Sequence, residues 1–450
     1  MKKRLSKKIS ELFDKESKTL FKNSSWVFIA NTYGVGLAFL RSIVIARGLG
    51  AEILGIYTVI IAFVVTVQEI LKLNVPLGII KYGAHFISED RHDKLVSLLK
   101  SGIAASMLSA FASVIIISIL THFTYEHFFD IPGLQKFIIL YSIINGIAFL
   151  DNIGRATLKI YYKFRLNSIV QMSMDTFEFI TITTCIYLFH NNLDYFFYAV
   201  VFSKLINSTI CNLAVFYELR RELKNHLGTG INKIKDQYKE ISNFIIGNSF
   251  GNTLKTFLNQ GDVLLLNLWG SHAAVGLYSV SKKLAYAILT VTDPLVTSIY
   301  PQLAHLVSQK KYVELKLMLS KITKLALIPV TFFTLIVFAF KGHIITFIYG
   351  EEFRSAAQTF FIHFIGAVQG SLFFWCLPLI QGLGLTYLRL QSYIIAIIID
   401  VLLAWQLTPQ YGANGVAIGL LAANLITTFY FVYYSQRKIN TEIKLSVSTI

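Results

Sequence analysis

The chain has 450 residues, of which 54% are hydrophobic and 15% are charged, and its formal net charge is +16. A soluble fold of this composition would expose large apolar patches, which soluble monomers rarely do, and disorder is excluded because it requires low hydrophobicity. Long apolar runs with only 7 prolines therefore predict an all-α integral membrane protein rather than an outer-membrane barrel, whose strands alternate in short segments.

Residues 1–24 are polar and basic, with apolar residues such as Leu5, Ile9 and Leu12 at helical spacing. They contain neither a long apolar run nor a small-residue cleavage site, so they lack the pattern of a signal peptide. We expect a cytoplasmic amphipathic segment that lies on the inner surface of the membrane.

Twelve apolar segments follow, each close to the roughly 20 residues that a helix needs to cross a bilayer. We predict twelve transmembrane helices, in an N-terminal six-helix lobe (25–216), a cytoplasmic linker (217–242), a C-terminal six-helix lobe (243–434) and a cytoplasmic tail (435–450). The segments lie at about 25–46, 52–73, 97–120, 134–153, 168–190, 195–216, 243–268, 273–299, 322–345, 357–381, 389–407 and 412–434.

The basic residues are distributed unevenly between the loops. With twelve spans, 31 of the 41 Lys and Arg residues lie on the side of the two termini and 4 lie on the opposite side. Because Lys and Arg concentrate in cytoplasmic loops, we expect both termini to be cytoplasmic. The net charge therefore mostly orients the chain and contacts anionic lipid, and we expect no nucleic-acid partner.

The two halves of the chain resemble each other at an offset of about 220 residues. The matching runs are GAEILGIY (50–57) with GSHAAVGLY (270–278), AHFIS (84–88) with AHLVS (304–308), and FRLNS (164–168) with LRLQS (388–392). Each copy lies at the matching point of a six-span half. This repeat predicts two pseudo-symmetric parallel lobes with a cleft between them, an arrangement suited to alternating access.

Polar residues occupy one face of the segment 243–268. Asn248, Asn252, Lys255, Asn259 and Asp262 are spaced by 4, 3, 4 and 3 residues, which places them on one side of a helix. Lipid cannot satisfy such groups, so this face is expected to look into protein or water.

Other predicted spans near the cleft carry similar groups at matching places. Together these residues form our predicted substrate-binding set: Arg41, Asn248, Asn252, Lys255, Asn259, Asp262, Lys282, Lys283, Asn31 and Gln68. Its basic members outnumber Asp262, so the site would favour an anionic ligand, a phosphate in particular.

Interhelical ion pairs and hydrogen bonds that only fix packing are the alternative interpretation of charges in the spans. This interpretation fits Asp175, Glu178, Lys204 and Asp400 best, because they belong to peripheral spans. For Arg41 and Asp262, a structural ion pair is the alternative to a role in binding.

Neither a Walker-type glycine loop nor an H-E-x-x-H motif occurs in the sequence. The 3 cysteines lie in apolar runs, and their spacing fits neither a zinc site nor a disulfide framework. We predict that the protein is not an enzyme and uses no metal or cofactor. Without a nucleotide site, transport would draw on an ion gradient, the membrane potential or the substrate gradient.

Short motifs are spread over nearly the whole chain. They include RGLGAEILGIY (47–57), GDVLLL (261–266), YPQLA (300–304), YGEEF (349–353) and YGANGVA (411–417). In order and spacing they resemble the bacterial oligosaccharide flippase (polysaccharide transport) family. Its superfamily also contains the multidrug and toxin extrusion (MATE) transporters and the lipid II flippases.

The resemblance implies two six-helix lobes around a cationic cavity. It implies flipping of undecaprenyl-diphosphate-linked oligosaccharide units of O-antigen, capsule or another surface polysaccharide across the bacterial cytoplasmic (inner) membrane. Arg41, Asp262 and Lys283 are carried over by position. The implied partners are the lipid-linked glycan, membrane lipids, a coupling ion (H⁺ or Na⁺) and other polysaccharide-assembly membrane proteins.

Two other functions are alternatives for such a chain. A cation-coupled multidrug exporter of the same fold would require acidic residues to dominate the cavity, whereas the predicted cavity is basic. A membrane glycosyltransferase or polymerase would need a large extracytoplasmic loop or a cluster of catalytic acids, and the sequence predicts neither.

Overall fold

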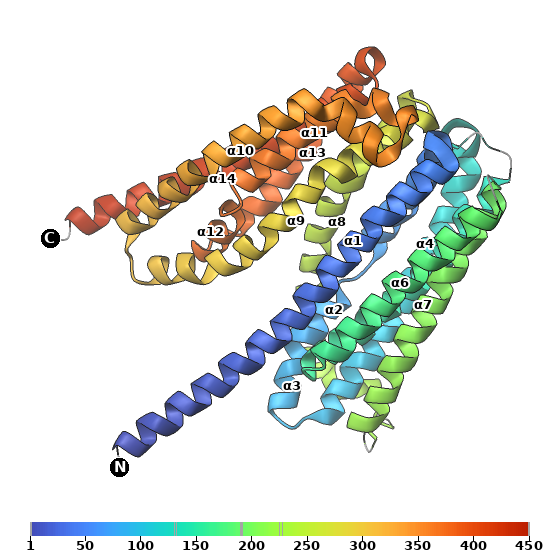
Figure 1. Cartoon of the computed structure of the whole chain (residues 1–450). Helices are drawn as coiled ribbons and strands as arrows, with labels where there is room; N and C mark the ends of the chain where they lie inside the picture. The colour runs from blue at the N-terminus through green and yellow to red at the C-terminus, as the bar shows by residue number, and fades with distance from the viewer. Residues whose placement is uncertain are drawn as a thin grey trace. The chain divides into compact units, whose positions relative to one another are not determined.

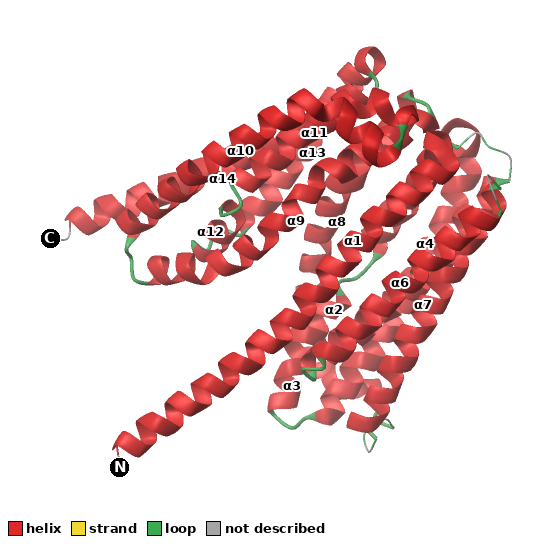
Figure 2. Ribbon diagram, viewed as in Figure 1, coloured by secondary structure: helices red, strands yellow, loops and turns green. Residues whose placement is uncertain are grey.

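In the described part of the computed structural model the regular elements are helices joined by loops, and no strand occurs among the described residues (Figure 2). The backbone is described for residues 2–129, 131, 133–189, 192–224, 226 and 228–448. Within these ranges the side chains of residues 2–21, 126, 127, 288, 290, 291, 293, 294, 297 and 446–448 are not described. The predicted amphipathic character of residues 1–24 therefore lies largely outside the described side chains.

Figure 1 shows the elements in chain order. The long helices are α1 (Lys2–Leu71), α4 (His92–Phe128), α5 (Leu134–Ile160), α6 (Phe164–Leu188), α7 (Leu193–Glu222), α8 (Tyr238–Trp269), α9 (His272–Ser308), α10 (Tyr312–Tyr349), α11 (Ala357–Leu372), α13 (Tyr387–Tyr411) and α14 (Ala413–Ser448). The short ones are α2 (Val75–Gly78), the π-helix η1 (Ile79–Gly83), α3 (Ala84–Ser88), η2 (Ile231–Gln237), η3 (Glu351–Ala356) and α12 (Cys376–Gly382).

The prediction of a helical membrane protein is confirmed, and all twelve predicted spans fall on helices. Two of them lie on α1, and 357–381 is divided between α11 and α12. In the described part of the chain, 8 helical stretches are long and apolar enough to cross a membrane, and Lys22–Leu71 covers two predicted spans. Helices α6, α8 and α9 are not among these 8, and they carry many of the charged and amide side chains singled out from the sequence.

The first two predicted spans are separated by a kink in α1 at Gly50. Gly50 has φ 78 and ψ 177, a conformation that residues with a Cβ rarely adopt. The break leaves the next backbone N–H without a helical partner, and the Ala51 N–H donates to Glu352 Oε1 at 2.8 Å instead. The kink is therefore capped by a carboxylate from η3.

The chain divides into two compact units. Unit 1 contains Met1–Val44, Val67–Tyr125 and Ile131–Phe250, and unit 2 contains Ile45–Thr66, Glu126–Asp130 and Gly251–Ile450. The middle of α1 and the end of α4 thus belong to the unit that holds most of the second half. The division into lobes at 25–216 and 243–434 stays a prediction.

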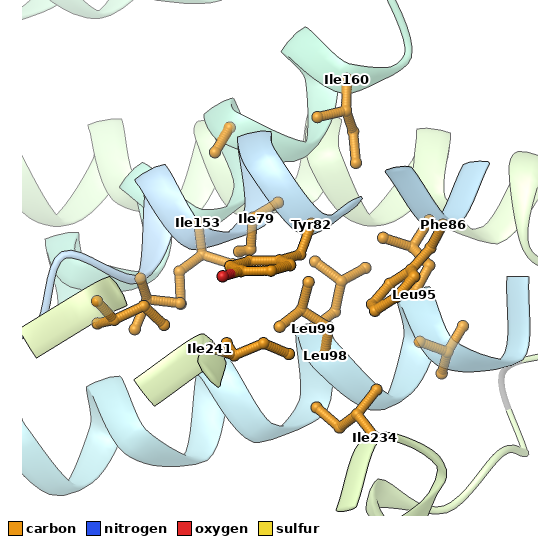
Figure 3. Close-up of a cluster of buried hydrophobic side chains, with 14 of the residues drawn as sticks. Ile79, Tyr82, Phe86, Leu95, Leu98, Leu99, Ile153, Ile160, Ile234 and Ile241 are labelled. Carbon is orange, nitrogen blue, oxygen red and sulfur yellow. The ribbon is translucent and has the colours of Figure 1, made fainter. Parts of the chain in front are cut away.

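Unit 1 has an apolar core where η1, α3, α4 and α5 meet (Figure 3). Ile79, Phe86 and Leu95 are completely buried there. The segment 217–242, predicted as a linker, contributes to this core, because Ile234 and Ile241 are buried in it. The Tyr82 hydroxyl also donates to Glu240 Oε1 at 3.0 Å, so the start of α8 is fastened to unit 1.

The predicted repeat is visible inside unit 2, where the second part of α1 crosses the start of α9. A Cβ added to Gly55 would lie 1.7 Å from the His272 carbonyl oxygen, and one added to Gly276 would lie 1.9 Å from the Ala51 carbonyl oxygen. Gly276 lies 221 residues after Gly55, and His272 lies 221 residues after Ala51. The two contacts therefore lie at equivalent positions of the repeat. The crossing is therefore self-complementary, as a two-fold axis requires.

A second pair of contacts in unit 2 obeys the same relation. Arg47 Nε donates to the Ile348 carbonyl at 2.9 Å, and its guanidinium also donates to the Phe347 carbonyl. Asn267 Nδ2 donates to the Phe128 carbonyl at 2.6 Å. Position 47 matches 267, and 128 matches 348, at an offset of 220. Arg47 of α1 thus caps the carbonyl end of α10, and Asn267 of α8 caps the carbonyl end of α4. In each case the first helix of one repeat caps the third helix of the other.

Candidate functional site

The centre of unit 2 contains a buried ion pair between α8 and α9. Asp262 is completely buried, and its Oδ2 accepts from Lys282 Nζ at 2.5 Å and from the Tyr278 hydroxyl at 2.5 Å. The helices are joined at Ser271, whose hydroxyl accepts from the Ala274 N–H and caps α9. Because this tight turn reverses the chain, it places Asp262 opposite Tyr278 and Lys282, about two and three helical turns into α9.

The ion pair is asymmetric in its exposure. The Asp262 carboxylate is inaccessible, but the side chain of Lys282 is 20% exposed. Lys282 Nζ also donates to the Asn259 carbonyl at 2.7 Å. The carboxylate therefore positions an ammonium group that a ligand can still reach, and it compensates the cost of holding a charge inside the protein.

The cluster of buried polar side chains around Asp262 includes residues of three further helices, α11, α13 and α14. The Tyr278 ring packs edge-on against His363 of α11, with 4.7 Å between ring centroids. Asn424 of α14 donates to the Tyr286 hydroxyl at 3.0 Å. Asp400 of α13 is buried and lies close enough to Asp262 and Lys282 to interact with them electrostatically.

The sequence did not single out His363 and Asn424. Each is the one imidazole or amide in an apolar run, with only threonines at helical spacing, so periodicity carries little signal for it. Asp400 was noticed as a charge in a span and assigned to packing. Its burial at 3% exposure places it inside unit 2.

The rest of the polar face of α8 is accessible. Lys255 and Asn259 are exposed, while Asn248 and Asn252 are half-buried. Asn248 Nδ2 donates to the Phe244 carbonyl of its own helix at 2.7 Å. Within the described part of the chain, Lys255 makes no ion pair. This face presents one ammonium group and a row of amides spaced by helical turns.

Lys283 lies next to Lys282 on α9 and is exposed. Among the predicted residues, the structure of unit 2 thus brings together Asn259, Asp262 and Lys282 through direct contacts. Lys255 lies on the same helical face as Asn259, four residues earlier. Unit 2 therefore holds a cationic, hydrogen-bonding surface built on one buried carboxylate.

The predicted residues of unit 1 have different surroundings. Arg41 of α1 forms an ion pair with Glu178 of α6 at 2.5 Å, and Lys204 of α7 lies near enough to interact with Glu178. Tyr33 and Thr176 join the same two helices through a hydroxyl–hydroxyl bond of 2.7 Å. Asn31 is exposed. Glu178, assigned to packing, is therefore the carboxylate that holds Arg41.

Gln68 is buried, at 1% exposure, in unit 1. Its Oε1 accepts from Asn145 Nδ2 at 2.6 Å, and its Nε2 donates to the Ser142 carbonyl at 2.8 Å. Both ends of the amide are thus satisfied by neighbouring helices, as a buried polar side chain requires. In this conformation Gln68 joins helices and does not face a ligand.

Among the described residues, no group of three or more His, Cys, Asp or Glu side chains is arranged to hold a metal ion. Cys185, Cys211 and Cys376 are free thiols. The polar groups of both units are ion pairs and amides rather than a set of metal ligands.

The chain was compared with known protein families and curated proteins. A family profile described as "Polysaccharide biosynthesis protein" matches residues 20–307. No curated protein matches the chain in sequence.

Three solved structures with a similar fold are described by name as two MATE transporters and a lipid II flippase. A multidrug resistance MATE family transporter of the MOP superfamily, in an inward-facing conformation, matches with a TM-score of 0.70 at 13% identity, covering 91% of this chain and 96% of that one. The lipid II flippase MurJ, in an inward closed conformation, matches with a TM-score of 0.67 at 14% identity, covering 92% and 89%. A MATE transporter of Vibrio cholerae matches at 0.61 and 13% identity, covering 94% and 97%.

Proposed function

Because this chain belongs to the polysaccharide biosynthesis protein family, we propose that it is a flippase for undecaprenyl-diphosphate-linked oligosaccharide units. It would move units of O-antigen, capsule or another surface polysaccharide across the cytoplasmic membrane by alternating access. The observation that carries the proposal is the accessible face of α8 and α9, with Lys255, Asn259 and the exposed edge of Lys282. Ammonium groups suit a diphosphate, and amides suit sugar hydroxyls.

The fold supports this proposal. It is shared with a lipid II flippase, whose cargo is by name a lipid-linked compound. We place the protein in the bacterial inner membrane with both termini in the cytoplasm, and we propose that H⁺ or Na⁺ supplies the energy. Other polysaccharide-assembly membrane proteins would deliver and receive the cargo.

A cation-coupled multidrug exporter is the second candidate, because MATE transporters share the fold. The surroundings of Asp262 favour it less. An exporter of organic cations needs an accessible carboxylate, whereas Asp262 is completely buried and already paired with Lys282. The accessible charges on this surface are ammonium groups.

The variant Lys255→Ala tests the proposed function. A hydrogen bond to a charged group is worth about 1.5–3 kcal/mol, so losing the ammonium is expected to lower transport about tenfold or more. The measurement is surface polysaccharide display in a strain that lacks the native gene, at matched protein level. Flipping of a labelled lipid-linked oligosaccharide in proteoliposomes gives the same comparison in vitro.

Lys239→Ala is the matched control, because Lys239 is an exposed lysine at the start of the same helix and outside its polar face. We expect this variant to transport normally. Normal display by Lys255→Ala at normal protein level would contradict the anion-binding surface. Raised resistance to organic cations on overexpression, without an effect on surface polysaccharide, would favour the exporter.

A further inference from the structure

A cavity of about 330 Å³ lies inside unit 2, away from the polar face of α8. It is bounded by α10, by α14 and by the break between α11 and α12, elements that appear together in Figure 1. Its volume is within the range of about 300–1,000 Å³ that small-molecule sites occupy. Nothing in the proposed transport mechanism uses this cavity.

Two helices contribute the same pattern of residues to the cavity. The lining residues of α10 lie at positions 316, 319, 320, 323 and 324, and those of α14 at 432, 435, 436, 439 and 440. Each set has the i, i+3, i+4, i+7, i+8 spacing of a single helix face. The cavity is therefore a continuous slot between two antiparallel helix faces.

Cationic and amide side chains line the slot along its length. Lys316 Nζ donates to Asn440 Oδ1 at 3.0 Å, which holds this ammonium at the rim. Lys324 lies two turns further along α10, about 12 Å away along the axis, and is exposed. Gln436 lies between them on the α14 side. Two ammonium groups, of Lys316 and Lys324, and two amides, of Gln436 and Asn440, thus line the same cavity.

The other walls of the slot are apolar and part of a packed core. Leu319, Leu379 and Ile439 line the cavity and belong to the buried core of unit 2. Trp375 is held in place because its indole N–H donates to Thr323 Oγ1 at 3.0 Å. These walls are set by core packing, so the slot is formed before any ligand arrives.

Ser435 provides an independent sign of a ligand. It lines the cavity at 1% exposure, and its hydroxyl has no hydrogen-bond partner among the described residues. A buried hydroxyl without a partner costs about 1–3 kcal/mol, so native proteins rarely leave one unsatisfied. A polar ligand group in the slot would satisfy it.

We infer that this slot binds one anionic phospholipid, with its phosphate between Lys316 and Lys324 and its glycerol backbone at Ser435. One of its two acyl chains then lies along Leu319, Leu379 and Ile439. A phospholipid fits because it combines an anionic phosphate with an apolar chain, as the slot combines ammonium groups with an apolar wall. The predicted topology places the slot at the cytoplasmic face, where anionic lipids attract basic residues.

The test uses the full-length protein purified in detergent and titrated with phosphatidylglycerol, phosphatidylcholine or inorganic phosphate. Bound lipid is counted by native mass spectrometry, and stability is followed by thermal unfolding. Lys316→Gln/Lys324→Gln is expected to weaken phosphatidylglycerol binding at least tenfold. Ser435→Leu, which fills the slot, should do the same without changing any charge.

Lys311→Gln/Lys321→Gln is the matched control, because Lys311 directly precedes α10, Lys321 lies on it, and neither lines the cavity. It should bind phosphatidylglycerol as the unmodified protein does. Equal binding of phosphatidylcholine, full occupation by inorganic phosphate alone, or unchanged binding by both slot variants would each overturn the inference. Because the readout is lipid binding, a failure here is distinct from a failure of the flippase proposal.

Discussion

Replacing Lys282 by alanine is expected to lower the free energy of unfolding by about 3–5 kcal/mol. The substitution leaves the Asp262 carboxylate completely buried, and its remaining hydrogen-bond partners among the described residues are the Tyr278 hydroxyl and the Val263 N–H. A buried charge without its counter-ion is among the most costly defects in a protein interior. Thermal unfolding of the detergent-purified protein measures the loss.

The double variant Asp262→Asn/Lys282→Met separates the stabilising role of Lys282 from its role in binding. Removing both charges together is often neutral for stability, so the double variant should recover most of the loss. Transport should remain low in both variants, because the accessible ammonium is missing in each. Lys239→Ala, at an exposed lysine at the start of α8, should change stability by no more than about 0.5 kcal/mol. A Lys282→Ala variant as stable as Lys239→Ala would show that the buried ion pair is not formed.

Substituting either glycine of the self-complementary crossing should give the second large effect. In Gly55→Ala or Gly276→Ala the new methyl group would lie 1.7 or 1.9 Å from a carbonyl oxygen, far inside van der Waals contact. The helices must separate, which loses packing on both sides of the crossing. We expect a destabilisation of about 1–3 kcal/mol for each variant, and more for leucine.

Because both glycines belong to one crossing, their substitutions should not be additive. Once the first methyl group has pushed the helices apart, the second meets more space, so the double variant should cost less than the sum. Gly342→Ala is the control, because a Cβ added to Gly342 in α10 has no atom within 4 Å. This change should be neutral or stabilise by up to about 1 kcal/mol. If Gly55→Ala behaved like Gly342→Ala, the close approach of α1 and α9 would be wrong.

Composition and periodicity were sufficient to predict the helices of this protein. A span needs only a long apolar run, and each such run carries its signal locally, so all twelve predicted segments fall on helices. The repeat could also be recognised in the sequence. Its two copies share a glycine, Gly55 and Gly276, at positions where a side chain does not fit. The polar face of α8 followed from spacing alone, since a helix places residues three and four apart on one side.

The partner of each polar side chain depended on the tertiary structure. Asp262 pairs with Lys282, Arg41 pairs with Glu178, and the Gln68 amide is hydrogen-bonded to Asn145. The spacing of residues shows which side of a helix is polar, but it does not show which helix packs against that side. Burial depends on that neighbour, and burial separates a residue that joins helices from one that a ligand can reach.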